Sequence, residues 1–212
     1  MQIAYNGFGS FTFTFKPAQA DVTLVTNPFV SPSVKFKSVA ASLVVSSHDG
    51  KDANNFKDIS PEHPDEGQQV FPVSHAGEYE VRGVFVTGID APKKDGTPHA
   101  IYRFDCEGIH IGYLGALDRG LTEKEIDALG PIDVLILPAG GNGVLTASQA
   151  TEIVSQIEPR IVIPSYANGE DGYGTADAIK RELSGPTEEV SKFKIVKAGL
   201  PEEDMKLVTF TK

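Results

Sequence analysis

The sequence predicts an α/β sandwich of one domain, residues 1–212, in which helices cover the outside of two β-sheets. Three observations support this prediction. The first half of the chain alternates apolar and polar residues with the period of strands, strand–helix units follow after Gly115, and strands return near the end of the sequence. No Ser/Gly-rich linker or low-complexity tract divides the chain, so a single domain is expected.

The N-terminal half is predicted to be a series of strands joined by turns. Phe11, Phe13 and Phe15 alternate with threonines, and Gly7 and Gly9 precede them, which indicates a hairpin. Further strands are expected at residues 22–26, 43–45, 69–73, 79–81, 83–88, 100–105 and 109–114.

Two long connections interrupt these strands. Residues 31–42 are rich in Pro, Ser and Lys, and we expect a connector with a short helix over residues 34–38. Residues 49–67 contain Pro61 and Pro64 and are predicted to be a surface loop. Loops of this length in compact domains are often functional.

The second half of the chain carries the predicted helices. Thr122 and Glu125 have the spacing of a capping box, which starts a helix, and Thr146 is placed to cap another helix through Ile157. Residues 134–138 are continuously apolar, as in a strand that is buried on both faces. The remaining elements are expected at residues 160–164 (strand), 176–183 (helix), 193–196 and 207–210 (strands).

Composition and charge exclude several classes of function. The net charge is −10 and the pI is about 4.9, which argues against a general nucleic-acid binder, because such proteins present a basic surface to phosphates. No apolar run approaches the roughly 18 residues that span a bilayer, and the first residues lack the pattern of a secretory signal. The single cysteine, Cys106, cannot form an internal disulfide, and no neighbour would activate it as a nucleophile. These features predict a cytoplasmic protein.

The loop that follows the apolar strand at residues 43–45 is the first candidate site. It contains His48 and Asp52, four positions apart, in a segment crowded with polar residues. Such a loop is held by a buried strand and is reached by solvent, as functional loops are. The pair is either half of a metal site or a structural histidine beside a solvated aspartate, and both interpretations remain open at this point.

The other histidines give weaker signals. His63 and His75 are expected to be solvated loop and turn residues, and His110 is expected on the polar face of a strand. His99 starts a strand and could point either way. The glycine-rich loop at residues 139–143 follows a strand but lacks the spacing of a phosphate-binding loop.

Seven short motifs also occur in a fixed order along the chain. They are Tyr5-Asn6-Gly7-Phe8-Gly9-Ser10-Phe11, Val25-Thr26-Asn27-Pro28-Phe29, Ser47-His48-Asp49-Gly50-Lys51-Asp52-Ala53, Gly77-Glu78-Tyr79-Glu80-Val81, Leu114-Gly115-Ala116-Leu117, Ile132-Asp133-Val134-Leu135-Ile136-Leu137-Pro138-Ala139-Gly140-Gly141 and Ile161-Val162-Ile163-Pro164-Ser165-Tyr166. Together they resemble the metallo-β-lactamase superfamily, in particular its small stand-alone Zn-dependent hydrolase-like members. The resemblance implies an αββα sandwich of the metallo-β-lactamase type, with two mixed sheets, helices on the outer faces and a metal site on one edge.

The same resemblance implies where the metal ligands of the family would stand. His48 and Asp52 keep two of these positions. Two further histidines, the bridging aspartate and the last histidine are replaced by Gly50, Ala53, Ala116 and Tyr166, respectively. An opening histidine and an early aspartate of the family motifs are replaced as well, by Phe8 and Asn27.

These replacements lead to the functional expectation. Zinc sites draw on three or four ligands, and glycine and alanine offer none. We therefore expect a metallo-β-lactamase-fold protein with a degenerate metal site, a pseudoenzyme or binding module without a cofactor. The alternative is a divergent, mononuclear Zn-dependent hydrolase that uses His48 and Asp52, with Asp118 or His99 as an auxiliary ligand. A metal-independent acid/base enzyme that uses His48 with Asp52 is a third option.

The partner is not specified by the sequence. It is expected to be a small molecule or a protein, with neither nucleic acid nor membrane involved, and a homo-oligomer is left open. The charge of −10 favours a cationic or neutral partner over an acidic one.

Overall fold

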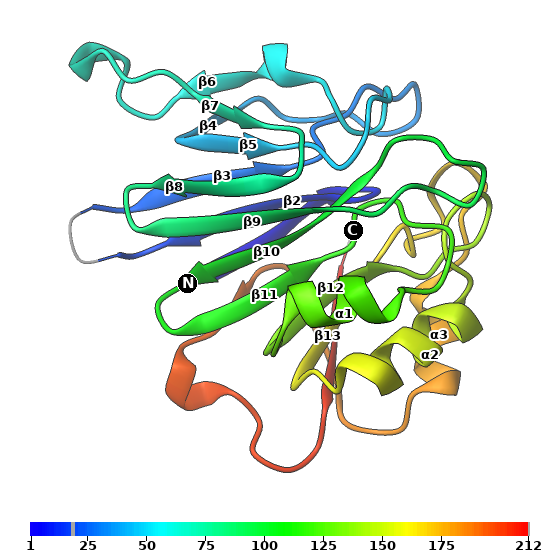
Figure 1. Cartoon of the computed structure of the whole chain (residues 1–212). Helices are drawn as coiled ribbons and strands as arrows, with labels where there is room; N and C mark the ends of the chain where they lie inside the picture. The colour runs from blue at the N-terminus through cyan, green and yellow to red at the C-terminus, as the bar shows by residue number, and fades with distance from the viewer. Residues whose placement is uncertain (18–19, 212) are drawn as a thin grey trace.

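Two mixed β-sheets packed face to face form the centre of the structure, a computed structural model that describes residues 1–17 and 20–211 (Figure 1). Within these residues the first sheet has six strands, in the order β15 (Phe193–Lys194), β1 (Gln2–Gly7), β2 (Ser10–Phe15), β3 (Val22–Thr26), β5 (Leu43–Val45) and β7 (Phe71–Val73). The second sheet has eight in the same range, in the order β14 (Thr187–Val190), β16 (Lys206–Phe210), β13 (Ile161–Ser165), β12 (Val134–Pro138), β11 (Ile109–Tyr113), β10 (Ala100–Cys106), β9 (Val84–Asp90) and β8 (Gly77–Val81).

The core lies between the two sheets. Phe11, Phe13 and Phe15 of β2 alternate with threonines, and all three phenylalanines are fully buried on the inner face. Phe13 meets Phe104 of β10 edge to face, with ring centroids 5.6 Å apart. The period-2 pattern of the sequence therefore marks the strand face that packs against the opposite sheet.

The three α-helices described cover the outer face of the eight-stranded sheet (Figure 1). They are α1 (Glu123–Leu129), α2 (Ala147–Ile157) and α3 (Ala176–Glu182). Both predicted caps are present: Thr122 with Glu125, and Thr146 with Gln149, form capping boxes. Ile153 of α2 is buried in the cluster that includes apolar residues of β12, β13 and β16.

The outer face of the six-stranded sheet is covered by a long loop and a small ribbon. The ribbon pairs β4 (Val39–Ala41) with β6 (Ile59–Pro61). Phe36 is buried in the cluster that contains Val25 and Val44 of the sheet, and Val34 packs against the same cluster. The helix predicted over residues 34–38 is wrong, because none of these residues is helical, and burial of Phe36 against the sheet holds the segment as a loop.

Most of the predicted strands are confirmed, with shifts of one to three residues at their ends. Strands β4, β6 and β14 were not predicted, since they are short and carry no clear apolar alternation. Four 3-10 turns complete the described elements: η1 (Phe56–Asp58), η2 (Pro64–Glu66), η3 (Glu170–Gly172) and η4 (Lys197–Gly199).

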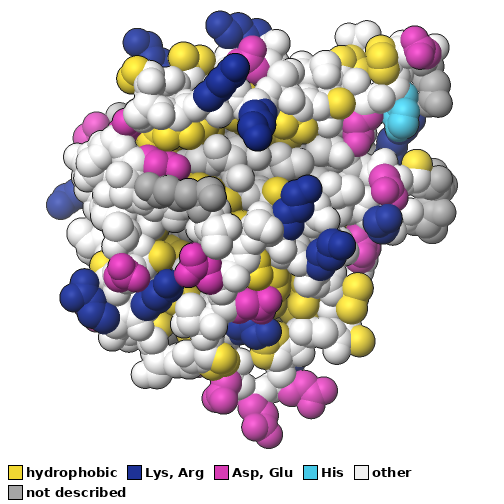
Figure 2. All heavy atoms as spheres, turned by 180° about the vertical axis from the view of Figure 1, so that it is seen from behind, with side chains coloured by type: hydrophobic (Ala, Val, Ile, Leu, Met, Phe, Trp, Pro, Cys, Tyr) yellow, Lys and Arg dark blue, Asp and Glu magenta, His cyan; other side chains and the backbone are white. Residues whose placement is uncertain are grey.

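The surface carries charges of both signs. Figure 2, which shows the face opposite to that of Figure 1, has Lys and Arg interspersed with Asp and Glu rather than gathered by sign. Of the helices in the described part of the chain, none has the length and apolar character that crossing a bilayer requires.

Candidate functional site

A continuous chain of hydrogen bonds joins the two sheets where β3, β5 and β13 end. The side chain of Asn27 donates from Nδ2 to Ser47 Oγ (2.8 Å), and its Oδ1 accepts from the Ser47 backbone N–H (2.8 Å). Ser47 Oγ lies 3.0 Å from His48 Nδ1, and His48 Nε2 lies 3.0 Å from Asp52 Oδ1. Tyr166, after β13, donates from its hydroxyl to Asp52 Oδ2 over 3.0 Å. We refer to Asn27, Ser47, His48, Asp52 and Tyr166 as the site network.

The ionised carboxylate of Asp52 can only accept, so the His48 Nε2 that faces it carries a proton and donates. In the neutral form of the ring, Nδ1 then accepts from the Ser47 hydroxyl, whose oxygen also accepts from Asn27. Both ring nitrogens of a neutral His48 are therefore engaged within the protein.

The network also sets the charge of its members. Burial tends to raise the pKa of Asp52, but hydrogen bonds from His48 and Tyr166 and the nearby His48 ring outweigh burial and lower it. Burial and the Asp52 carboxylate raise the pKa of Tyr166 well above its usual range. Asp52 is thus an anion at neutral pH and Tyr166 a neutral donor to it.

His99 stands beside this network. It is 5% exposed, and its ring stacks near that of His48 with centroids 6.0 Å apart. Its Nε2 accepts from the Ala116 backbone N–H (3.2 Å), so its Nδ1 donates to the Ala91 carbonyl (3.1 Å). Burial lowers the pKa of His99 to about 3, so the ring is neutral. Through these two bonds, the His99 side chain connects the loop at Ala91 to the loop at Ala116.

Three of the replaced positions are tightly packed. Ala53 and Ala116 are 0% and 1% exposed. A Cβ atom added to Gly50 would lie 2.8 Å from both His48 Nε2 and Asp52 Oδ1. The hydrogen bond between these two atoms therefore requires a residue without a side chain at position 50.

The residues present do not fit a zinc site. Of the positions that would hold ligands, only His48 and Asp52 have imidazole or carboxylate donors, and these are bonded to each other. No cluster of three or more His, Cys, Asp or Glu suited to a metal ion occurs in residues 1–17 and 20–211. Asp118, the predicted auxiliary ligand, accepts instead from the Lys94 backbone N–H (2.9 Å) in a neighbouring loop. Three or four ligands are needed for a tightly held zinc ion.

The remaining candidates lie elsewhere or are occupied. His110 contacts Arg103 and Asp105 on the outer face of β10 and β11. His63 has no bond from its ring among the described contacts. Burial raises the pKa of the Cys106 thiol to about 11, which makes it a poor nucleophile, as expected.

Aromatic side chains close the network from one side. Tyr166 contacts Tyr173, with ring centroids 5.0 Å apart, and Phe8 lies 6.1 Å from Tyr173. Gly9 allows this packing, since a Cβ there would come within 2.6 Å of the Tyr166 ring. The sequence analysis missed Tyr173 altogether, and it treated Asn27 and Ser47 only as motif positions. Their polar pairing becomes visible only when β3 and β5 are side by side.

Three residues at or beside the site network have a strained backbone conformation. Phe8, Asn27 and Tyr166 have φ angles of 52°, 39° and 51°, in the left-handed region that non-glycine residues seldom adopt. Such strain costs about 1–3 kcal/mol per residue and concentrates at functional sites. All three positions correspond to those where the resemblance indicated replaced polar residues.

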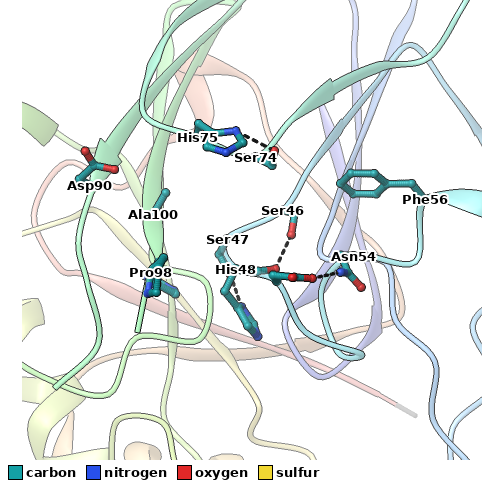
Figure 3. Close-up of a pocket in the computed structure, with 12 residues that line it drawn as sticks. Ser46, Ser47, His48, Asn54, Phe56, Ser74, His75, Asp90, Pro98 and Ala100 are labelled. Carbon is teal, nitrogen blue, oxygen red and sulfur yellow. Dashed lines mark hydrogen bonds between the residues drawn. The ribbon is translucent and has the colours of Figure 1, made fainter. Parts of the chain in front are cut away.

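A pocket of about 360 Å³ opens next to the network (Figure 3). It lies between loops of both sheets: the loop after β5, the β7–β8 turn, and the ends of β9 and β10. Its lining comprises Ser46, Ser47, His48, Asp49, Asn54, Phe56, Ser74, His75, Asp90, Pro98, His99 and Ala100. The volume is at the lower end of the range for small-molecule sites, about 300–1,000 Å³.

The arrangement limits the available chemistry. Ser47, His48 and Asp52 follow one another in hydrogen-bonded order, yet Ser47 is 1% exposed and its oxygen is engaged with both Asn27 and His48. A nucleophile needs a path to its substrate, so Ser47 is not placed for covalent catalysis. The pocket offers recognition groups more readily than an attacking group.

Comparison with known proteins agrees with this fold. The profile of a family described as the beta-lactamase superfamily domain matches residues 2–166. A UPF0173 protein of Pyrococcus abyssi is 41% identical over 54 residues, a segment that spans 26% of this chain and 25% of that relative.

Solved structures resemble most or all of the chain. A proposed Zn-dependent hydrolase of the metallo-β-lactamase superfamily from Thermotoga maritima superposes with a TM-score of 0.81 at 22% identity, covering 100% of this chain and 99% of that one. Igni18, a metallo hydrolase from Ignicoccus hospitalis, gives a TM-score of 0.62 at 18% identity over 85% and 89% of the two chains. The short form of human tRNase Z gives 0.56 at 10% identity over 78% and 92%.

At these identities the structures establish the fold alone, whereas the family profile covers more than half of the chain. The chain belongs to the beta-lactamase superfamily and has the metallo-β-lactamase fold.

Proposed function

We propose that this protein is a binding module that keeps the metallo-β-lactamase fold without zinc-dependent hydrolysis. The observation that supports this most is the direct hydrogen bond between His48 Nε2 and Asp52 Oδ1. In this arrangement the two remaining ligand groups satisfy each other. Their outer partners, Ser47 and Tyr166, complete the bonding on either side.

The energetics support the same proposal. A full structural zinc site contributes roughly 10–16 kcal/mol through three or four ligands, and activation of water needs a metal that is tightly held. Recruiting His48 and Asp52 to a metal would break their mutual bond and the bond from Tyr166. Gly50, Ala53 and Ala116 supply no replacement ligand.

The test is the metal content of protein that is purified without chelators. Less than about 0.1 equivalent of Zn, Mn or Fe per chain is the expected result, and about one tightly bound equivalent overturns the proposal. His48→Ala serves as the matched variant, because metal that disappears with this substitution is held at the site network.

The alternative function is a mononuclear metal-dependent hydrolase that uses His48 and Asp52. It is favoured by the structural neighbours that are described as hydrolases. It requires a third ligand, and Asp118 and His99 are the candidates. Metal-dependent hydrolysis of a phosphodiester or thioester substrate by the wild type, lost in His48→Ala and Asp52→Ala, would establish this alternative.

A further inference from the structure

We propose that the pocket beside the site network binds a small organic cation, a protonated amine that carries an apolar group. This proposal deepens the proposed function, on which it rests, by naming the class of ligand. It depends on the carboxylates and the apolar walls of the pocket.

The acidic side chains of the pocket lie in its lining, whereas Lys93 and Arg119, close enough to His99 to lower its pKa, lie outside the lining. Asp49 and Asp90 line the pocket, and its lining residues, all within the described part of the chain, include no Lys or Arg. The carboxylate of Asp90 makes no hydrogen bond or ion pair with any described residue, whereas Asp49 accepts one from the side chain of Asn54. An unpaired carboxylate at the rim of a pocket attracts a cation and repels an anion.

The imidazoles of the lining differ in what they can offer a ligand. His48 and His99 both have their ring nitrogens engaged by protein groups, and His99 is held neutral by its burial. His75 shares its Nδ1 with Ser74 Oγ (3.0 Å), and no described residue bonds its Nε2. His75 is therefore the one lining histidine in the described chain with a ring nitrogen still available to a ligand.

Apolar groups form the rest of the wall. Phe56, Pro98 and Ala100 line the pocket together with the two carboxylates. In Figure 3, Phe56 and Asp90 lie on opposite sides of the view, with Ser74 and His75 above and His48 below. A ligand with a charged end and an apolar end can meet a carboxylate and the face of an aromatic ring in one site, and the ring itself attracts cations.

The test is a titration of the ¹⁵N-labelled full chain with three probes of equal size. Benzylamine is a cation at pH 7, benzyl alcohol is neutral and benzoate is an anion. We expect benzylamine to bind in the millimolar range, as befits so small a ligand, with shifts in the amide signals of Asn54, Ser74, His75 and Ala100. Benzyl alcohol should bind at least fivefold more weakly, and benzoate should not shift these signals.

Two variants assign the charge that is responsible. Asp90→Asn keeps the shape of the side chain and removes its charge. It should weaken the binding of benzylamine about fivefold, which is close to the upper range for an exposed ion pair. Asp127→Asn, on the exposed face of α1, removes one charge elsewhere and should change nothing.

Three results overturn the proposal: benzoate binding as tightly as benzylamine, no binding of benzylamine at this pocket, or equal affinity in Asp90→Asn. The metal content of the same sample is measured independently. An amine that fails to bind to metal-free protein removes this proposal and leaves the proposed loss of zinc chemistry standing.

Discussion

The hydroxyl of Tyr166 donates to Oδ2 of Asp52 over 3.0 Å, and these two residues, 114 positions apart, connect the loop after β5 to the end of β13. Tyr166 is 1% exposed, whereas 37% of the Asp52 side chain reaches solvent. The phenol thus anchors a partly exposed carboxylate from the buried side. This bond takes the place that the resemblance assigned to a histidine–metal contact.

Tyr166→Phe should lower the free energy of unfolding by about 1 kcal/mol, because water can replace only part of the lost bond to a charged acceptor. Urea unfolding monitored by circular dichroism measures this change. Tyr173→Phe is the matched control, since no described residue bonds its hydroxyl, and it should stay within about 0.5 kcal/mol of wild type. Equal values for the two variants would show that the bond to Asp52 contributes nothing.

Gly50→Ala should be destabilising although its side chain is only a methyl group. The new Cβ would lie 2.8 Å from both His48 Nε2 and Asp52 Oδ1 and would force them apart. A loss of about 1–2 kcal/mol in unfolding free energy is expected for a broken bond between these groups. Gly120→Ala, where a Cβ has open space, is the control. A Gly50→Ala protein as stable as the control would contradict the packing described for this loop.

His99 should make the protein less stable in mild acid. Its pKa is about 3 in the folded protein, because of burial, and about 6.5 in the unfolded chain, so the unfolded state binds more protons between these values. The contribution of the neutral His99 ring to the free energy of unfolding is therefore fully present above about pH 6.5. It decreases as the pH falls towards 3, by up to about 1.4 kcal/mol per pH unit.

His99→Gln removes this titration, so its stability relative to wild type should improve steadily from pH 7 to pH 4. Chemical unfolding at each pH gives the two curves. His63→Gln, which changes a histidine whose ring has no described bond, should run parallel to wild type. Parallel curves for His99→Gln would mean that the pKa of His99 is the same in the folded and unfolded states, which would contradict its lowered pKa.

The Glu170 carboxylate should protect the backbone amide of Phe8 from hydrogen exchange. Its Oε2 accepts from the Phe8 N–H (2.9 Å) and from the Tyr5 hydroxyl (2.8 Å), which joins the loop after β13 to the β1–β2 turn. Glu170→Ala should speed hydrogen exchange at Phe8 at least tenfold, as expected when a local opening becomes easier by about 1.4 kcal/mol. Exchange measured by NMR provides the rate, with Glu182→Ala at the end of α3 as control. Unchanged exchange at Phe8 would exclude this role for the carboxylate.

Much of the fold could be predicted because its signals are local. The alternation at Phe11, Phe13 and Phe15 and the capping residues Thr122 and Thr146 each correspond to an observed element. The prediction of a helix over residues 34–38 failed because the conformation there is not determined locally. It is determined by burial of Phe36 against a sheet formed elsewhere, and no local pattern reports that contact.

The site shows the same division. His48 and Asp52 could be selected from their loop, and the structure does bring them together. That His99 would bond to the backbone of Ala116 could not be foreseen, because this contact exists only once β10 and β11 are paired and their loops approach. Its neutral charge follows from that burial rather than from its sequence neighbours.

The pairing of β15 with β1 has a consequence for how the chain folds. Gln2 and Ile3 pair with Lys194 and Phe193, so the first sheet is completed by segments that lie almost the whole described chain apart. Closing so long a loop costs conformational entropy before any contact repays it, and folds dominated by such distant pairings form in milliseconds to seconds rather than microseconds. Until β15 pairs with it, β1 is the edge of the first sheet, and an unpaired edge is where a partly folded chain can pair with another copy.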